Sequence, residues 1–256
     1  MRTQMKTLVA ALAIAGVTAM PTTASAANVG LELLLLTDVS GSVDTTEYDL
    51  QKQGYVSAFQ SAAVQNAILG SAGGSIAVAY GEWSGANQQS LQVSWTIIDS
   101  VAAANAFAAA INNSTRAFSG ATAPGSALNW GVSSAVGMFT NTIDSTRQVI
   151  DVSGDGSQND GATTSTARNA ALAAGVDAIN GLPILGSEAN LLAWYQNNIQ
   201  GGAGSFTLAA NSFADFQTAI ESKLVKEISQ VPEPFSAALV GLGLLGLGLT
   251  RRRQKQ

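Results

Sequence analysis

The segment Val29-Gly30-Leu31-Glu32-Leu33-Leu34-Leu35-Leu36-Thr37-Asp38-Val39-Ser40-Gly41-Ser42 is an apolar run that ends in a short polar loop. A nearly continuous apolar run of this length, here Val29 to Leu36, is typical of a strand buried on both faces of a parallel sheet. Directly after the loop, Asp44-x-x-Glu47 has the spacing of a capping box, which predicts a helix that continues to about Leu69. A strand followed by a helix predicts an α/β protein.

The following segments extend this pattern. Ser75 to Trp83 predicts a second strand, and the alternation of Leu91, Val93, Trp95 and Ile97 with polar residues predicts a third. Only seven residues separate these strands, too few for a helical crossover, so they are expected to pair antiparallel at one edge. Further helices are predicted near 101–111, 125–139, 163–174, 189–198 and 213–228, and further strands near 148–152, 176–185 and 206–210. We therefore predict one domain over 27–230, a doubly wound, mostly parallel sheet with one antiparallel edge strand and helices on both faces.

The composition excludes several chemistries. The 256 residues include no cysteine and no histidine, so disulfides, Cys or His zinc sites and His-based catalytic triads are ruled out. Residues 27–230 contain sixteen acidic and six basic side chains, a net charge of −10. Such a charge disfavours nucleic acid and anionic membrane surfaces as partners and favours a cation.

The first 26 residues have the features of a secretory signal peptide. Arg2 and Lys6 precede an apolar run from Leu8 to Met20, and Ala24-Ser25-Ala26 is a small-residue cleavage pattern that predicts processing before Ala27. The alternative, a buried N-terminal helix, does not explain that pattern. We expect the protein to be exported.

The C-terminal residues 231–256 form a second targeting segment. Val231-Pro232-Glu233-Pro234 precedes an apolar run at 235–250, and Arg251-Arg252-Arg253 follows it. This arrangement resembles the PEP-CTERM sorting signal of Gram-negative bacteria, which implies a transient inner-membrane anchor, cleavage by an exosortase and delivery to the cell surface or the medium. A permanent single-span anchor is the alternative, with the basic residues on the cytoplasmic side.

Three predicted loops carry hard oxygen ligands. Asp38, Ser40 and Ser42 follow the first strand, Thr122 precedes a helix in Ser119-Gly120-Ala121-Thr122, and Asp155 ends the strand Val149-Ile150-Asp151-Val152-Ser153-Gly154-Asp155. Carboxylate and hydroxyl oxygens suit Mg²⁺, with Mn²⁺ and Ca²⁺ as alternatives. Ligands of open α/β sheets bind beyond the carboxyl ends of the strands, where these loops are expected. Taken alone, Asp38 and its serines are equally compatible with a simple turn.

Together the three loops resemble the metal-ion-dependent adhesion site (MIDAS) of the von Willebrand factor type A (VWA) domain. The resemblance implies that Ser40, Ser42 and Thr122 supply hydroxyl oxygens and that Asp38 and Asp155 act directly or through water. It also implies that the ion, usually Mg²⁺, keeps one position for an acidic group of a partner. Further segments, among them 76–83, 149–156, 179–185 and 223–228, are similar to an exported bacterial branch of this superfamily. Two features depart from the pattern of that family. Pro124-Gly125-Ser126 has no acidic residue where many relatives are expected to have one, and Ser153-Gly154-Asp155-Gly156 replaces the common ending of a hydroxyl residue followed directly by Asp-Gly. Both bear on the affinity for the ion rather than on the identity of the site.

Three further residues have structural interpretations. Asp151 is expected to be a structural carboxylate bonded to nearby backbone or to Arg147, because a buried unpaired charge would be costly. Glu82 and Trp83 end the second strand, where a capped strand end with a packed indole is favoured over a ligand-contacting surface.

These features favour an exported, metal-dependent binding or adhesion module that holds a protein or an extracellular polymer through an acidic group. Two alternatives stay open. A metal-assisted hydrolase would use the same ion, with a carboxylate such as Glu82 as its base, although no catalytic triad is present. A structural surface protein would retain only a vestige of the site. The sequence favours a non-enzymatic role.

Overall fold

A computed structural model of the chain describes residues 27–230, so the predicted signal peptide and sorting signal lie outside the described residues. The strands are β1 (Ala27–Val29), β2 (Glu32–Asp38), β3 (Ile76–Trp83), β4 (Gln89–Ile98), β5 (Ile143–Ser145), β6 (Gln148–Gly154), β7 (Ala178–Pro183) and β8 (Gly201–Gly202). The helices are α1 (Thr45–Gln60), α2 (Ala62–Leu69), α3 (Val101–Asn112), α4 (Pro124–Gly131), α5 (Thr164–Ala174), α6 (Leu191–Asn198) and α7 (Phe216–Ser229), with short 3-10 turns η1 (Ala72–Gly74) and η2 (Phe213–Asp215).

The central sheet has six strands in the order β4-β3-β2-β6-β7-β8. Strands β3, β2, β6 and β7 are parallel, and β4 pairs antiparallel with β3 at one edge, as predicted. The two-residue β8 adds a short antiparallel pairing with β7 at the other edge. The predicted fold class is confirmed. Strand order reverses between β2 and β6, which is where ligands of doubly wound sheets bind.

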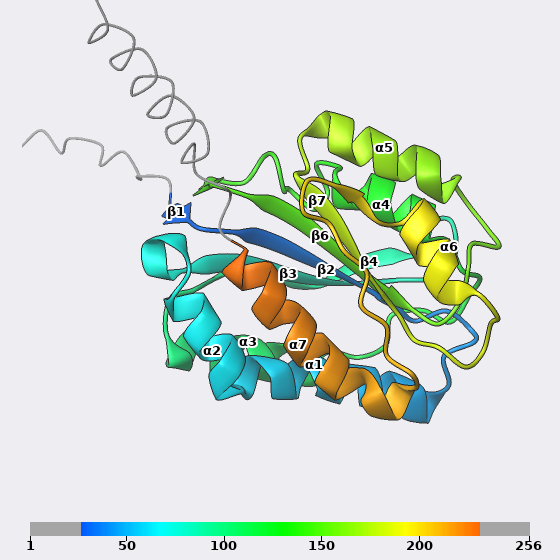
Figure 1. Cartoon of the computed structure of the whole chain (residues 1–256), viewed down its shortest axis with the longest axis horizontal. Helices are drawn as coiled ribbons and strands as arrows, with labels where there is room; N and C mark the ends of the chain where they lie inside the picture. The colour runs from blue at the N-terminus through cyan, green and yellow to red at the C-terminus, as the bar shows by residue number, and fades with distance from the viewer. Residues whose placement is uncertain (1–26, 231–256) are drawn as a thin grey trace, which may run out of the picture.

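Helices cover both faces of the sheet (Figure 1). Consecutive leucines of β2 point to opposite faces, because side chains alternate along a strand. Leu33 and Leu35 pack in the core beneath α1, α3 and α7, whereas Leu34 and Leu36 pack in the core beneath α4, α5 and α6. The apolar run is therefore explained by burial on two faces.

Helices α1 and α7 approach closely because α1 contains a glycine at their contact. A methyl group on Gly54 would lie 2.5 Å from Cδ1 of Phe216 in α7, well inside normal contact distance. On its other side, α7 contacts the sheet through Lys223 and Glu227, which meet Asp151 of β6 and Asn180 of β7.

Four predicted elements have different bounds in the structure. The predicted first strand is interrupted after Val29, and β1 pairs with β5 in a separate two-stranded sheet. The predicted helix from 44 to 69 is divided at Ser61, whose extended backbone ends α1 and whose hydroxyl caps α2 at Val64 N. The helix predicted to reach Phe139 ends at Gly131, and turns follow, one of them at Gly137 with φ of 80°. The strand predicted at 206–210 makes only isolated parallel bridges, from Thr207 and Ala210.

The ends of the described chain and the loop that follows β2 lie at opposite ends of the sheet. In Figure 1, β1 and the end of α7 lie at the left, and β2 runs away from them towards the right-hand edge, where its polar loop begins. Within residues 27–230, no helix combines the length and the apolar character that a membrane span requires.

Leu35→Ala is expected to destabilise the protein by about 2–5 kcal/mol, because it removes a fully buried side chain and leaves a cavity in the core under α1 and α7. Urea denaturation will measure the change in the free energy of unfolding. Leu69→Ala is the matched control, because Leu69 is 43% exposed and should change stability by less than about 0.5 kcal/mol. Equal effects of the two substitutions would contradict the described packing.

Candidate metal centre

The first loop begins at Asp38, the last residue of β2, and turns back sharply. The carboxylate of Asp38 accepts a hydrogen bond from Ser40 N at 2.7 Å, and Val43 N donates to Ser40 O at 3.1 Å. These bonds hold the backbone of the loop that carries Ser40 and Ser42. Gly41 N donates to Gly120 O at 2.7 Å, which joins this loop to the one that carries Thr122.

All five predicted ligands belong to one hydrogen-bonded group. Ser42 Oγ donates to Asp155 Oδ1 at 2.7 Å, and the hydroxyls of Ser40 and Ser42 are 3.2 Å apart. Thr122 Oγ1 donates to Ser40 Oγ at 3.3 Å. The structure thus brings together three stretches that are far apart in the sequence, at the carboxyl ends of the neighbouring strands β2 and β6.

Two side chains that the sequence analysis missed hold these loops in place. The guanidinium of Arg116 donates to the carbonyl oxygens of Val39, Ser40 and Val43 at 2.7–3.0 Å. Asn159 Oδ1 accepts from Thr122 N at 2.8 Å. Neither residue lies in a recognisable motif, so only the folded structure assigns them this role.

The electrostatics of the site favour a cation. Burial raises the pKa of Asp38 to about 7, because the charged carboxylate loses its hydration, while the bond from Ser40 N opposes the shift. Burial also raises the pKa of Asp155, and the hydrogen bond from Ser42 opposes that shift. A dication bound beside both carboxylates would favour their charged forms.

Several buried oxygen atoms at and near Asp38 have no hydrogen-bond partner among the described residues. They include Asp38 Oδ2 and the hydroxyl of Tyr195, a residue of α6 that the sequence did not single out. Buried polar atoms are almost always satisfied, so an orphaned carboxylate oxygen at this position fits a site for a cation. The donor set of two carboxylates and three hydroxyls suits Mg²⁺ and other hard dications.

Within residues 27–230, no cluster of three or more His, Cys, Asp or Glu side chains is placed to hold a metal ion. The candidate centre differs from such clusters because three of its five oxygen donors are neutral hydroxyls.

Glu82 and Trp83 are buried, as the favoured interpretation predicted. Glu82 accepts hydrogen bonds from the Tyr48 hydroxyl at 2.9 Å and from Ala117 N at 2.8 Å, so both of its oxygens are engaged. The Trp83 side chain packs in the core under α4 and α6. Neither side chain is exposed to a ligand.

Asp151 is a buried carboxylate, but both predicted partners, nearby backbone and Arg147, were wrong. Its carboxylate contacts Lys223 Nζ of α7 at 2.6 Å, and not Arg147. Arg147 instead donates to Glu227 O and to the side chain of Gln230 at the C-terminal end of α7, where the helix dipole favours a cation.

A family model described as "Protein of unknown function (DUF1194)" matches residues 28–232. The chain belongs to this family. The search of curated proteins gives no match.

Solved structures share the fold of this DUF1194 protein at low sequence identity. Proximal thread matrix protein 1 from the mussel byssus has a TM-score of 0.55 and 17% identity, over 81% of this chain and 49% of that chain. A structure of the same mussel protein with a zinc-occupied MIDAS motif has a TM-score of 0.56 and 18% identity, over 80% and 49%. The pilus adhesin SpaC from Lactobacillus rhamnosus GG has a TM-score of 0.57 and 14% identity, over 79% and 31%.

This chain therefore spans about half or less of the length of these proteins. At these identities the likeness shows the fold, which is VWA-like.

In this DUF1194 protein, Gly154→Ala is expected to weaken magnesium binding at least about tenfold and to destabilise the fold by about 1–3 kcal/mol. A methyl group on Gly154 would lie 2.7 Å from Asp38 Oδ2 and 2.8 Å from the Tyr195 hydroxyl oxygen, both fully buried. The matched control is Gly156→Ala, where the nearest atoms would be 3.8–4.0 Å away. Calorimetry with Mg²⁺ will compare the two variants, and equal affinities would show that Asp38 is not part of the site.

Proposed function

We propose that this protein is an exported binding module that engages an acidic group of its partner through a divalent cation. Asp38, Ser40, Ser42, Thr122 and Asp155 would hold the cation, which we propose is Mg²⁺, with Mn²⁺ and Ca²⁺ as alternatives. The observation that carries the proposal is that these five residues form one hydrogen-bonded group in which a buried carboxylate oxygen of Asp38 has no partner among the described residues. When bound, the ion would keep its Lewis acidity, because only two of its five protein ligands are charged.

The placement of the site in the domain supports a role in adhesion. The site lies at the edge of the sheet opposite β1 and the end of α7, from which the predicted targeting segments extend in the sequence (Figure 1). A domain tethered through either end would present this edge away from its anchor. The SpaC adhesin and the byssus matrix protein share the fold, which agrees with a binding role at a surface or in a matrix.

A cavity beside the site offers room for the rest of a partner. Its volume is about 440 Å³, and its lining includes Glu47, Leu50, Leu185, Ser187 and Phe213. Ser187 Oγ also donates to the backbone oxygen of Asp155, so the cavity adjoins the candidate centre directly. The partner we propose is a protein or an extracellular polymer that offers a carboxylate, and the setting is the envelope or surroundings of a Gram-negative bacterium.

The two targeting segments complete the proposal. A signal peptide at 1–26 would direct export, and the PEP-CTERM-like segment at 231–256 would be the substrate of an exosortase after transient anchoring in the inner membrane. Both segments lie outside the described residues.

A surface that carries only carboxylates tests the proposed function. The purified protein is expected to bind a carboxymethyl-dextran surface in the presence of Mg²⁺ and to be released by a chelator, whereas unmodified dextran should not retain it. Thr122→Val, which removes a hydroxyl and keeps the shape of the side chain, is expected to reduce binding at least about tenfold, the cost of one lost ligand. Surface plasmon resonance measures both. Retention that is equal with magnesium and with chelator would support the structural surface protein instead.

A further inference from the structure

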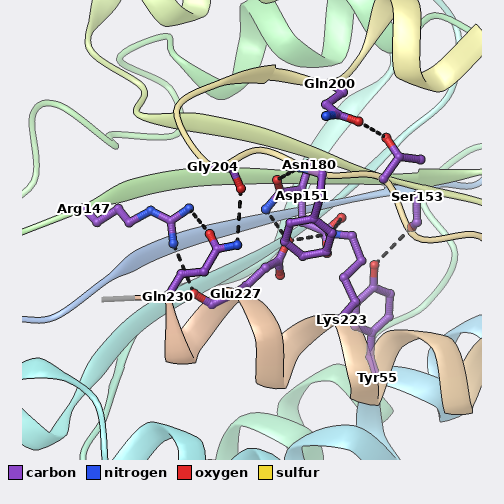
Figure 2. Close-up of polar contacts among 12 residues, drawn as sticks. Tyr55, Arg147, Asp151, Ser153, Asn180, Gln200, Gly204, Lys223, Glu227 and Gln230 are labelled. Carbon is purple, nitrogen blue, oxygen red and sulfur yellow. Dashed lines mark hydrogen bonds and ion pairs between the residues drawn. The ribbon is translucent and has the colours of Figure 1, made fainter. Parts of the chain in front are cut away.

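Four polar side chains meet in the core between the sheet and α7, away from the candidate metal centre. Asp151 of β6 and Asn180 of β7 are direct neighbours in the strand register, and Lys223 and Glu227 lie one helical turn apart on α7. All four residues have an exposure of 0%. Figure 2 shows the Lys223 side chain extending from α7 to the sheet, with Glu227 and Asn180 beside it.

The contacts within this cluster are short and directed. Lys223 Nζ lies 2.6 Å from Asp151 Oδ1 and 2.5 Å from Glu227 Oε1. Asn180 Nδ2 donates to the same Glu227 oxygen at 2.7 Å, and Asn180 Oδ1 accepts from Phe206 N at 2.9 Å. Asn180 is thus held by its own bonds and orients Glu227, while Lys223 Nζ donates a hydrogen bond to Glu227 and lies within contact distance of Asp151.

The cluster is poorly suited to carry full charges. One ammonium contacts both carboxylates, while the guanidinium of Arg147 donates to the backbone oxygen of Glu227 and to neither carboxylate, and Asp151 Oδ2 and Glu227 Oε2 have no hydrogen-bond partner among the described residues. Taking such ions out of water costs several kcal/mol each, and a proton moved from the ammonium to one carboxylate leaves a neutral amine and a neutral acid. Burial raises the pKa of Asp151, which favours its acid form.

The surroundings are apolar. The ring of Phe206 lies 5.5 Å from Lys223 Nζ, and Tyr55, Val149, Leu182 and Leu224 belong to the core cluster on this face of the sheet. A site that excludes water favours a reaction that releases water and protects its product from hydrolysis.

We propose that Lys223 and Asp151 join in an intramolecular amide bond, with Glu227 as the group that transfers the protons. Reacting groups held in contact have effective concentrations of roughly 10⁵–10⁸ M, so no activated intermediate is required for a slow, single-turnover reaction.

The reaction balances without an oxidant or a co-reactant. A proton moves from the Lys223 ammonium to the Asp151 carboxylate, which gives the amine and the carboxylic acid. The amine lone pair attacks Cγ of Asp151, and Glu227 takes a proton from the nitrogen and delivers it to the departing hydroxyl. The bond from Nζ to Cγ forms, the bond from Cγ to the hydroxyl oxygen breaks, one water leaves, and Glu227 returns to its carboxylate form.

The bond would tie the last helix of the domain to the central strand β6. The segment after α7 is the one that the sequence predicts to be an anchor, so force applied at that end would act on a covalent link rather than on packing alone. This inference does not depend on the metal site.

Trypsin digestion of the denatured full-length protein, followed by tandem mass spectrometry, tests the proposal. Trypsin normally cleaves after Arg147, Arg168, Lys223 and Lys226. The amide would block cleavage after Lys223 and leave residues 148–168 joined to residues 169–226, with a mass one water below the sum of the two peptides. Free peptide 148–168 and complete cleavage after Lys223 would overturn the proposal. A loss of ammonia within residues 169–226 would overturn it too, because it would identify Asn180 as the acyl group.

Three variants assign the roles. Lys223→Arg is expected to abolish the link while keeping a cation on α7, and Lys226→Arg, on the same helix and 3.8 Å from the Phe206 ring before substitution, is expected to leave the link complete. Glu227→Gln keeps an oxygen for Asn180 and should slow formation by roughly 10²–10⁴-fold, so unlinked protein accumulates. A complete link in Glu227→Gln would overturn the role of Glu227.

Discussion

Asp38→Asn is expected to stabilise the metal-free protein at about pH 8 and, in the same molecule, to remove its stabilisation by magnesium. The Asp38 carboxylate is fully buried and one of its oxygens has no partner among the described residues. An amide of the same shape removes the buried charge, and the pKa shift from 3.8 to about 7 corresponds to roughly 4 kcal/mol at most. The same substitution removes a charged ligand from the proposed cation site.

Urea denaturation with chelator and with saturating Mg²⁺ will measure both effects. The matched control is Asp144→Asn, because Asp144 is exposed on β5 and far from the site. The free energy of unfolding of this variant should equal that of the parent in both conditions. If Asp38→Asn lowers stability in chelator, or if magnesium stabilises it as much as it stabilises the parent, Asp38 does not have the role assigned to it.

Acidification is expected to weaken magnesium binding by about tenfold per pH unit once the pH falls below about 7. Mg²⁺ requires the carboxylate form of Asp38, whose pKa in the metal-free protein is raised to about 7 by burial. The metal-free protein should show the opposite trend. A carboxyl group with a raised pKa in the folded state contributes stability that is fully present below its unfolded value of 3.8 and is lost as the pH rises through about 7.

Calorimetric titrations from about pH 8 to about pH 5.5 will follow the affinity, and thermal unfolding in chelator will follow the stability. Proton release on binding, measured in two buffers with different ionisation enthalpies, provides an internal check, because it should increase as the pH falls. An affinity that is independent of pH over this range would contradict the assignment of Asp38 as a ligand.

The sheet was predictable because its strands carry strong local patterns. Leu33 to Leu36 are apolar on both sides since helices cover both faces. The alternation from Leu91 to Ile97 predicted the edge strand β4, but not its buried side: the pairing with β3 has a register shift at Tyr80, and Ile97 is exposed while Ile98 is buried. The segment predicted as a strand at 206–210 bonds to β7 through Leu208 N and Ala210 N but forms only isolated parallel bridges, and its first backbone N–H, at Phe206, is taken by the Asn180 side chain. Such a bond between distant residues leaves no periodic signal.

The candidate site was predictable to the extent that topology alone brings it together. Loops that follow parallel strands must meet at one edge, so Asp38, Thr122 and Asp155 were expected to converge, and they do. The supporting groups were not predictable. Arg116 contacts the first loop through backbone oxygens, which any residue offers, and Lys223 reaches Asp151 only because α7 packs closely on the sheet.

A calorimetric titration of the purified protein with Mg²⁺, repeated for Asp155→Asn and Asp144→Asn, tests the central claim most directly. We predict a saturable, single-site isotherm for the parent and for Asp144→Asn. For Asp155→Asn we predict at least about a tenfold loss of affinity, since Asp155 is one of the two carboxylates of the site. If the parent shows no heat of magnesium binding, or if all three proteins give the same isotherm, the result would contradict the existence of a metal centre at this edge of the sheet.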